Sequence, residues 1–257
     1  MIFMNILRKL IVHNRFGNHT ILFGEAITDA EIKEVFKLRY QVYSERDYIE
    51  VSKYPNQLET DEYDLSGKSH YFTAIIEENN YCKIIGCIRV IVDDPLPTEL
   101  DFEFSEPAEM RSIPRDRRFE IGRFIIIPPD KNNGKYLPRG VVRLFLLDLI
   151  GDYGIKHNLI GGYAFIKQTL DQKLKKFGFP VGYIKAYRQV YPENGVLYKY
   201  FTQKNDPVIP IYFISKQCFD FTQKAIHRQS MFEICDEDTY IFKDNILNNV
   251  LKVIKIV

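Results

Sequence analysis

An acidic and a basic residue interrupt the most strand-like run of the chain, from Phe119 to Ile127. On a regular strand, Glu120 and Arg123 would face opposite sides of the sheet, because successive side chains alternate. Gly122 between them would permit a β-bulge, which re-aims side chains and would bring both charges to one face. A carboxylate in such a site can act as a general base. The spacing therefore predicts a paired carboxylate–arginine site, with free backbone N–H groups near Ile125.

Further charged residues fall in otherwise apolar elements. Arg39 lies in a predicted helix with an apolar face, and Arg89 interrupts a strand-like run of β-branched residues. Between them, an acidic segment carries Asp61 and Asp64. Burying a lone charge is costly, whereas charge-assisted pairs between arginine and carboxylate survive burial. We therefore predict one compensated cluster with six members: Arg39, Asp61, Asp64, Arg89, Glu120 and Arg123.

A Gly-containing basic loop precedes a strongly apolar helix that is expected over residues 140–153. Unpaired backbone N–H groups and the helix dipole make such a helix start a ready site for anions. An ordinary surface loop before a capped helix would have the same composition, so this segment alone leaves both interpretations open. The residues that would form a pyrophosphate or phosphopantetheine site are Lys131, Gly134, Lys135, Arg139 and Gly140.

The remaining pattern alternates strands with helices. Apolar residues at helical spacing follow Thr28 or Asp29, either of which would cap a helix that runs through Tyr43. The alternation predicts a three-layer α/β (α+β) fold with a mixed central sheet and helices on both faces. Residues 1–216 are expected to form this domain, and residues 217–257 a C-terminal extension packed on it. The other expected strands cover residues 20–24, 70–77, 83–92, 160–165 and 209–215, with a helix over 168–176, a terminal helix over 246–257 and irregular segments over 45–68 and 95–117.

The composition argues against several classes of protein. The chain has 257 residues, of which 46% are hydrophobic, and its formal net charge is +1. These values are ordinary for a soluble protein and lack the basic excess of a nucleic-acid binder. The four cysteines form no C-x-x-C pair, so we expect no metal site and a reducing, cytoplasmic setting. We expect no signal peptide and no transmembrane segment, although the tail is compatible with peripheral membrane contact.

The polar residues occur in an order that resembles the acyl-homoserine lactone synthases, within the Gcn5-related N-acetyltransferase (GNAT) fold. Six motifs between residues 35 and 127 agree together in type and spacing. The general acyltransferase pattern continues more loosely over residues 128–180. The motifs are Leu38-Arg39-x-x-Val42-Tyr43, Glu59-x-Asp61-x-Tyr63-Asp64, His70-Tyr71, Gly86-x-x-Arg89, Leu96-Pro97 and Glu120-x-x-Arg123-Phe124.

The chain also departs from the lactone synthases. It contains no tryptophan, whereas that family usually carries one shortly after the helix that corresponds to the one with Arg39 here. The segment Tyr43-Ser-Glu45-x-x-Tyr48 is more similar to the long-chain N-acyl amino acid synthases, a sister group with the same fold. This resemblance implies an N-acyltransferase that moves a long-chain acyl group from acyl carrier protein to the α-amine of an amino acid. The alternatives are a lactone synthase that uses S-adenosylmethionine and a non-catalytic acyl-carrier-binding module.

The resemblance also implies roles for individual residues. Glu120 would deprotonate the amine, with Asp61 or Asp64 as alternative bases. The arginines would hold these carboxylates, and one arginine could instead bind the carboxylate of the acceptor. No cofactor would be tightly bound, and the donor would be an acyl-phosphopantetheine thioester on acyl carrier protein or coenzyme A. In these terms the catalytic residues are Glu120, Asp61, Asp64 and Arg123, and the substrate-binding residues are Arg39, Arg89, Tyr43, Tyr63, His70 and Ile125.

Overall fold

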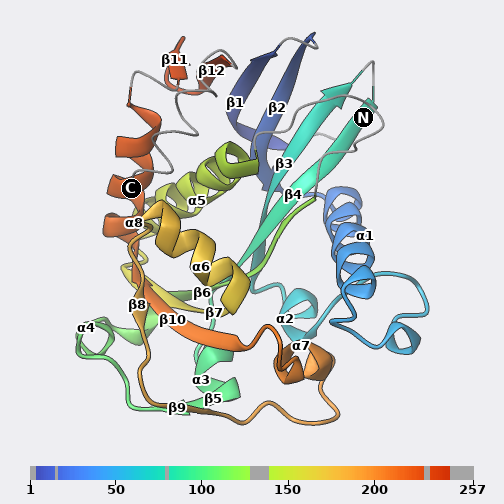
Figure 1. The fold of residues 1–257 in the computed structure, drawn as a ribbon, viewed down its shortest axis with the longest axis vertical. Coiled ribbons are helices and arrows are strands. Elements are labelled where there is room, and N and C mark those ends of the chain that lie inside the picture. The colour runs from blue at the N-terminus through green and yellow to red at the C-terminus, as the bar shows by residue number, and fades with distance from the viewer. Residues whose placement is uncertain (1–3, 15–16, 79–80, 128–138, 229–231, 244–257) are drawn as a thin grey trace.

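The computed structural model describes residues 4–14, 17–78, 81–127, 139–228 and 232–243. Within them, ten strands form one mixed sheet in the order β11-β12-β1-β2-β3-β4-β6-β7-β10-β8, and β5 pairs with β9 in a separate ladder (Figure 1). The large sheet contains β1 (Asn5–Asn14), β2 (Gly17–Ala26), β3 (Ser69–Glu78), β4 (Tyr81–Ile91), β6 (Arg118–Ile126), β7 (Gly161–Lys167), β8 (Gly182–Tyr183), β10 (Val208–Ile214), β11 (Phe232–Ile234) and β12 (Thr239–Lys243). The small ladder contains β5 (Phe102–Phe104) and β9 (Tyr187–Gln189).

Helices cover both faces of the sheet, with α1 on one side and α5, α6 and α8 on the other (Figure 1). The predicted three-layer fold with a mixed sheet is therefore confirmed. No helix among the described residues is long and apolar enough to cross a membrane. The α-helices are α1 (Asp29–Glu45), α2 (Glu62–Leu65), α3 (Pro97–Asp101), α4 (Ala108–Arg111), α5 (Arg139–Lys156), α6 (Gln168–Phe177), α7 (Tyr198–Thr202) and α8 (Ser215–Ile226), and two 3₁₀ turns cover Val51–Lys53 and Arg115–Arg117.

The helix α1, which carries Arg39, begins at the residue that the sequence indicates. The Thr28 hydroxyl accepts a hydrogen bond from the Glu31 backbone N–H (3.4 Å), and the Glu31 carboxylate accepts one from the Thr28 N–H (2.9 Å). This reciprocal capping box satisfies two N–H groups that would otherwise lack partners. The cap therefore fixes the first residue of α1. The start of the helix in turn determines which residues, Arg39 among them, lie on its buried face.

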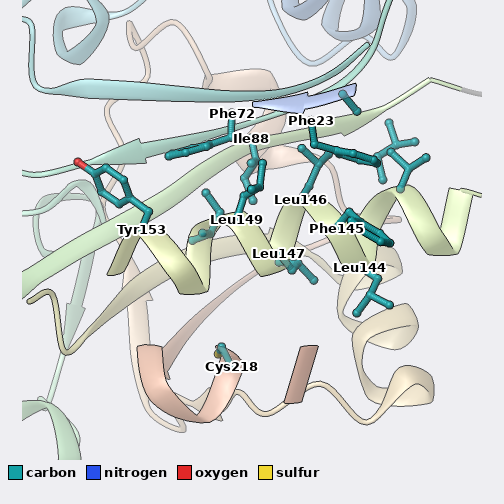
Figure 2. Packing of buried hydrophobic residues seen from close by; sticks show 14 of the residues in the cluster. Phe23, Phe72, Ile88, Leu144, Phe145, Leu146, Leu147, Leu149, Tyr153 and Cys218 are labelled. Carbon is teal, nitrogen blue, oxygen red and sulfur yellow. The ribbon is translucent and has the colours of Figure 1, made fainter. Parts of the chain in front are cut away.

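The larger core lies between α5 and the strands β2, β3 and β4. Figure 2 shows Phe145 and Leu146 of α5 directed towards these strands, while Cys218 of α8 lies on the other side of α5. The rings of Phe23 and Phe145 stack with their centroids 5.1 Å apart. On the opposite face of the sheet, a second core joins α1 to Cys87 and Ile125. The two cores hold the middle strands of the sheet rigidly between the helical layers.

The strands β6 and β7 run in parallel but are joined only at one end. Of their described residues, only Arg118–Glu120 pair with Gly161–Tyr163, so the strands separate beyond this point. A Cβ atom added to Gly162 would lie 1.7 Å from the Phe119 carbonyl oxygen, so only glycine permits the close contact at the joined end. The fold therefore opens a split in the sheet directly beside the Arg123 segment.

Several segments carry more structure than the sequence predicts. The expected loop over residues 45–68 contains a 3₁₀ turn and α2, which Asp61 caps, and residues 95–117 contain α3, β5, α4 and a second 3₁₀ turn. The strand β1 was not predicted, and it pairs in parallel with β12 of the C-terminal segment. The expected helix over 246–257, and the basic loop residues Lys131, Gly134 and Lys135, lie outside the described residues.

Candidate active site

Three arginines and three carboxylates meet on the α1 side of the sheet. Figure 1 locates the elements that supply them: α1, α2 with the segment that precedes it, β4 and β6. We call this set the arginine–carboxylate cluster. Its members are Arg39, Glu59, Asp61, Asp64, Arg89 and Arg123.

Each carboxylate in the cluster bridges two arginines. Glu59 accepts from Nε of Arg39 and from Nη2 of Arg123, the latter at 2.9 Å. Asp61 accepts from Nη1 of Arg89 and from Nη2 of Arg123, both at 2.7 Å. Asp64 takes two bonds from Arg39, at 3.0 and 2.7 Å, and a third from Arg89 at 2.8 Å. The alternating charges close into one network in which positive and negative groups balance.

Burial of this network is nearly complete. The side chains of Arg39, Glu59 and Asp64 have no exposed surface. The arginine charges hold the pKa values of the three carboxyl groups below their ordinary values, although burial alone would raise them. The cluster therefore stays ionised and suits positioning better than proton transfer. Asp61 and Asp64, predicted as alternative bases, are poor proton acceptors in this arrangement.

A β-bulge brings Arg123 into the cluster. Arg123 and Phe124 of β6 together face the single residue Ile88 of β4, because the register shifts between two neighbouring pairs. The predicted bulge is therefore present, but its left-handed residue is Arg123 (φ 54°) rather than Gly122. A non-glycine residue in this conformation is strained, and the buried ion pairs with Glu59 and Asp61 stabilise it.

Glu120 lies outside the arginine–carboxylate cluster, so the predicted Glu120–Arg123 pair is wrong. The bulge turns the Arg123 guanidinium towards Glu59, and Glu59 takes the sixth place in the cluster that we had assigned to Glu120. The Glu120 carboxylate instead accepts a hydrogen bond from the Thr98 N–H at 2.7 Å. Its side chain is buried, and this desolvation raises its pKa well above the ordinary value. Glu120 is thus a carboxyl group with raised basicity beside a set of ionised ones.

Asp101, at the end of α3, is a second carboxyl group that the sequence did not single out. Burial, together with the charges of Glu62 and Asp61, raises its pKa to about 7, while Arg123 acts in the opposite sense. The Asp101 charge also contributes to the raised pKa of Glu120, after the effect of burial. Carboxyl groups with raised pKa values often mark functional sites.

Asp101→Asn is expected to change how stability depends on pH. Folding raises the pKa of Asp101 from 3.8 to about 7, so its stabilising effect is full at low pH and is lost as pH rises through about 7. We expect the variant to melt at the same temperature as the wild type at ~pH 4 and at a higher one at ~pH 8. Melting curves by circular dichroism at both pH values would show it. If the melting temperatures of the variant and the wild type differed by the same amount at both pH values, this result would contradict the raised pKa of Asp101.

A cavity of about 160 Å³ passes beside the bulge and through the split between β6 and β7. Towards α1, aromatic and basic residues line it, and Tyr43 lies there with its ring 5.8 Å from the Arg123 guanidinium. Towards α5, α6 and α8 the lining also includes Arg143, Thr169, Lys173 and Ser215, but most of it is apolar: Leu147, Ile150, Leu170, Leu174, Phe213 and Cys218. Ile125, the predicted neighbour of the oxyanion donors, also lines the cavity and is buried.

The remaining predicted residues fall in different places. The Tyr63 ring lies 6.0 Å from the Arg89 guanidinium, at the edge of the cluster. His70 lies apart, since its Nδ1 is 2.9 Å from the Glu25 carboxylate and its ring packs on Tyr153 of α5. Gly140 is exposed in the first turn of α5. Arg139 begins α5, but its side chain is outside the described part of the chain.

The family model described as autoinducer synthase matches residues 25–201, which include every member of the arginine–carboxylate cluster, Glu120 and both sides of the split. The chain belongs to the autoinducer synthase family. This autoinducer synthase family member is an acyltransferase, as the motifs predicted. Among curated proteins, no sequence matches the chain.

Solved structures give the same fold for this member of the autoinducer synthase family. The CoA-dependent acyl-homoserine lactone synthase BjaI, solved with SAM and isopentyl-CoA, has a TM-score of 0.54 and 16% identity over 84% of this chain and 87% of its own. TofI, solved with an inhibitor and MTA, has a TM-score of 0.50 and 15% identity over 79% and 96%. FeeM, an N-acyl amino acid synthase from uncultured soil microbes, has a TM-score of 0.46 and 16% identity over 76% and 92%. The chain therefore shares its fold with BjaI and TofI.

Proposed function

We propose that this acyltransferase is an N-acyl amino acid synthase. It would transfer a long-chain acyl group from acyl carrier protein, in the cytoplasm, to the α-amine of an amino acid. The observation that carries the proposal is the placement of Glu120, a buried carboxyl group with raised pKa, on the strand whose bulge borders a two-sided cavity. The apolar side suits an acyl chain, and the polar side suits an amino acid.

In the proposed reaction, Glu120 takes a proton from the acceptor ammonium group, directly or through water. The free amine attacks the thioester carbonyl carbon, and a tetrahedral oxyanion forms. Backbone N–H groups at the bulge, near Ile125, would donate to this oxyanion. The C–S bond then breaks, and the nitrogen releases its extra proton to solvent, so that a neutral amide remains. The thiolate of phosphopantetheine takes the proton held by Glu120 and leaves as the thiol. The arginine–carboxylate cluster would hold the bulge in this geometry and would not exchange protons.

The choice of an amino acid as acceptor rests on the chain's own residues near α1. The chain has no tryptophan, and Tyr48 lies shortly after the arginine helix. Tyr48 is buried and lines the polar side of the cavity, where its ring packs edge-on against Tyr200 at 5.0 Å. The Tyr43 ring also packs edge-on against Tyr48, at 5.6 Å. We propose that this aromatic wall admits a compact amino acid rather than the larger S-adenosylmethionine.

The C-terminal residues are part of the same proposal. We propose that residues 1–216 form the acyltransferase domain and that residues 217–257 are an extension packed on it. The close approach of α8 to α5 supports this, because a Cβ atom on Gly151 would lie 3.0 Å from Phe219. The pairing of β12 with β1 supports it from the other edge of the sheet.

Lipid extracts of bacterial cells that express the protein are expected to contain N-acyl amino acids. Mass spectrometry of these extracts, with cells that express Glu120→Gln as the control, measures the product. Acyl-homoserine lactones in place of N-acyl amino acids would replace the proposal with the second candidate, a synthase that uses S-adenosylmethionine. Binding of acylated carrier protein with no product from any amine would indicate a non-catalytic module instead.

A further inference from the structure

Lys167, the last residue of β7, is a buried cation in the wall of the cavity. Its exposed fraction is 4%. The ammonium group donates to the Tyr200 carbonyl oxygen and lies over two rings, 4.3 Å from the centroid of Tyr200 and 5.2 Å from that of Tyr48. Only one of the three N–H donors of the group has an oxygen acceptor among the described residues, so two remain for a ligand.

No carboxylate in the described part of the chain forms an ion pair with Lys167. The acidic group with the largest effect on it is Asp206, but both oxygens of Asp206 accept bonds from Thr169, at 2.9 and 2.8 Å. Burial without a counterion lowers the pKa of Lys167 to about 8. A buried cation that faces a cavity and lacks a counterion is a natural site for an anionic ligand group.

The surroundings of Lys167 connect it to the proposed transfer point. The Arg123 guanidinium, at the bulge, lies over the Tyr43 ring. The Tyr43 ring stacks on the Tyr200 ring with centroids 6.5 Å apart, and the Lys167 ammonium group lies over the other ring of this pair. All these side chains line the polar side of the cavity. A small molecule on this side could therefore present one end to the bulge and the other to Lys167.

The arginines are less suited to bind the anionic group of a substrate. Nε, Nη1 and Nη2 of Arg39, and Nε and Nη2 of Arg123, already donate to Glu59, Asp61 and Asp64. The Nε atom of Arg89 has no partner, but it is buried away from any surface. The sequence hypothesis that one arginine binds the acceptor carboxylate therefore finds less support here than a site at Lys167.

We propose that Lys167 binds the α-carboxylate of the acceptor and so selects α-amino acids over simple amines. This inference rests on the proposed function, because it specifies how the acceptor is held there. The carboxylate would replace the missing counterion of Lys167, and the α-amine would then point towards the bulge and Glu120. Lys167 would act as a positioning and specificity residue, with no part in the proton transfer.

The test compares acceptors that differ only in the carboxylate. Purified wild type and Lys167→Met are assayed with acyl-loaded carrier protein and three pairs: glycine and methylamine, leucine and 3-methylbutylamine, tyrosine and tyramine. A charge-assisted hydrogen bond is lost in the variant, so KM for the amino acid should rise roughly 10- to 100-fold. The KM for the matched amine should stay the same. Lys167→Arg should recover part of the preference, and Lys216→Met, an exposed lysine on α8, serves as the control.

Two results would overturn the inference. Equal losses for both members of a pair would show that Lys167 only supports the structure, and an unchanged preference in Lys167→Met would show that it does not contact the carboxylate. If the wild type acylates S-adenosylmethionine instead, the proposed function fails. In that case, wild type and Lys167→Met are compared with S-adenosylmethionine and its decarboxylated form as the matched acceptors. This comparison tests whether Lys167 binds the acceptor carboxylate, whichever acceptor the enzyme uses. An enzyme that neither acylates nor binds any of these molecules contradicts both the proposed function and the inference about Lys167.

Discussion

Glu120→Gln is expected to abolish acyl transfer while the protein remains folded. The amide cannot accept the proton of the acceptor amine, and loss of a general base typically costs ~10²–10⁴ in rate. The fold should tolerate the change, because the glutamine oxygen can still accept the Thr98 N–H that now bonds to Glu120. Turnover with acyl-loaded carrier protein and the preferred amino acid measures the effect, and circular dichroism checks the fold.

A matched substitution separates this result from a general effect of losing a carboxylate. Glu103, an exposed residue of β5, pairs only with the exposed Arg188 in the described structure, so Glu103→Gln should keep normal turnover. Near-normal turnover of Glu120→Gln would remove Glu120 as the base. A loss of activity in Asp101→Asn alone would then favour Asp101, whose pKa of about 7 also suits proton transfer.

Glu59→Gln is expected to destabilise the protein severely. Glu59 compensates two arginines, and its loss leaves Arg39 and Arg123 with too little negative charge around them in a buried site. Breaking a buried ion pair costs about 3–5 kcal/mol, which is a large part of the ~5–15 kcal/mol that stabilises a typical domain. Urea unfolding followed by circular dichroism should show a lower midpoint with an unchanged slope.

An exposed ion pair provides the comparison for this effect. Asp94 pairs with Arg115 at 2.7 Å, and both side chains are about half exposed. Asp94→Asn should cost no more than about 1 kcal/mol, because solvent already screens that pair. If Glu59→Gln and Asp94→Asn had similar midpoints, the arginine–carboxylate cluster would not stabilise the fold as its burial indicates.

The sequence predicts the elements that carry a strong local signal. The Thr28 cap, the strand around Glu120 and the apolar helix α5 all follow from periodicity and capping residues that act within one turn or strand. β1 was missed, because its polar residues obscure the alternation and its partner β12 lies far along the chain. Local patterns do not report a pairing between strands that are more than 200 residues apart in the sequence.

The candidate site shows the same limit more sharply. Motif spacing correctly brought five members of the cluster together, but it assigned Glu120 to the sixth place, which Glu59 occupies. The strand pattern suggested a bulge, yet it could not show which carboxylate the Arg123 guanidinium would pair with once the bulge had redirected the side chain. Asp101 and Lys167 were missed, because their properties come from burial and from absent counterions rather than from neighbours in sequence.

The closed arginine–carboxylate cluster affects how such an enzyme could acquire a new substrate. Its members join α1, the segment that enters α2, β4 and β6, so a change in any of them disturbs the folding of the whole chain. The polar wall of the cavity is different, since Tyr48 packs there against other rings and the Lys167 ammonium group and is not a member of the arginine–carboxylate cluster. We expect adaptive changes, in nature or in directed evolution, to accumulate in this wall, where acceptor preference can vary at little cost in stability.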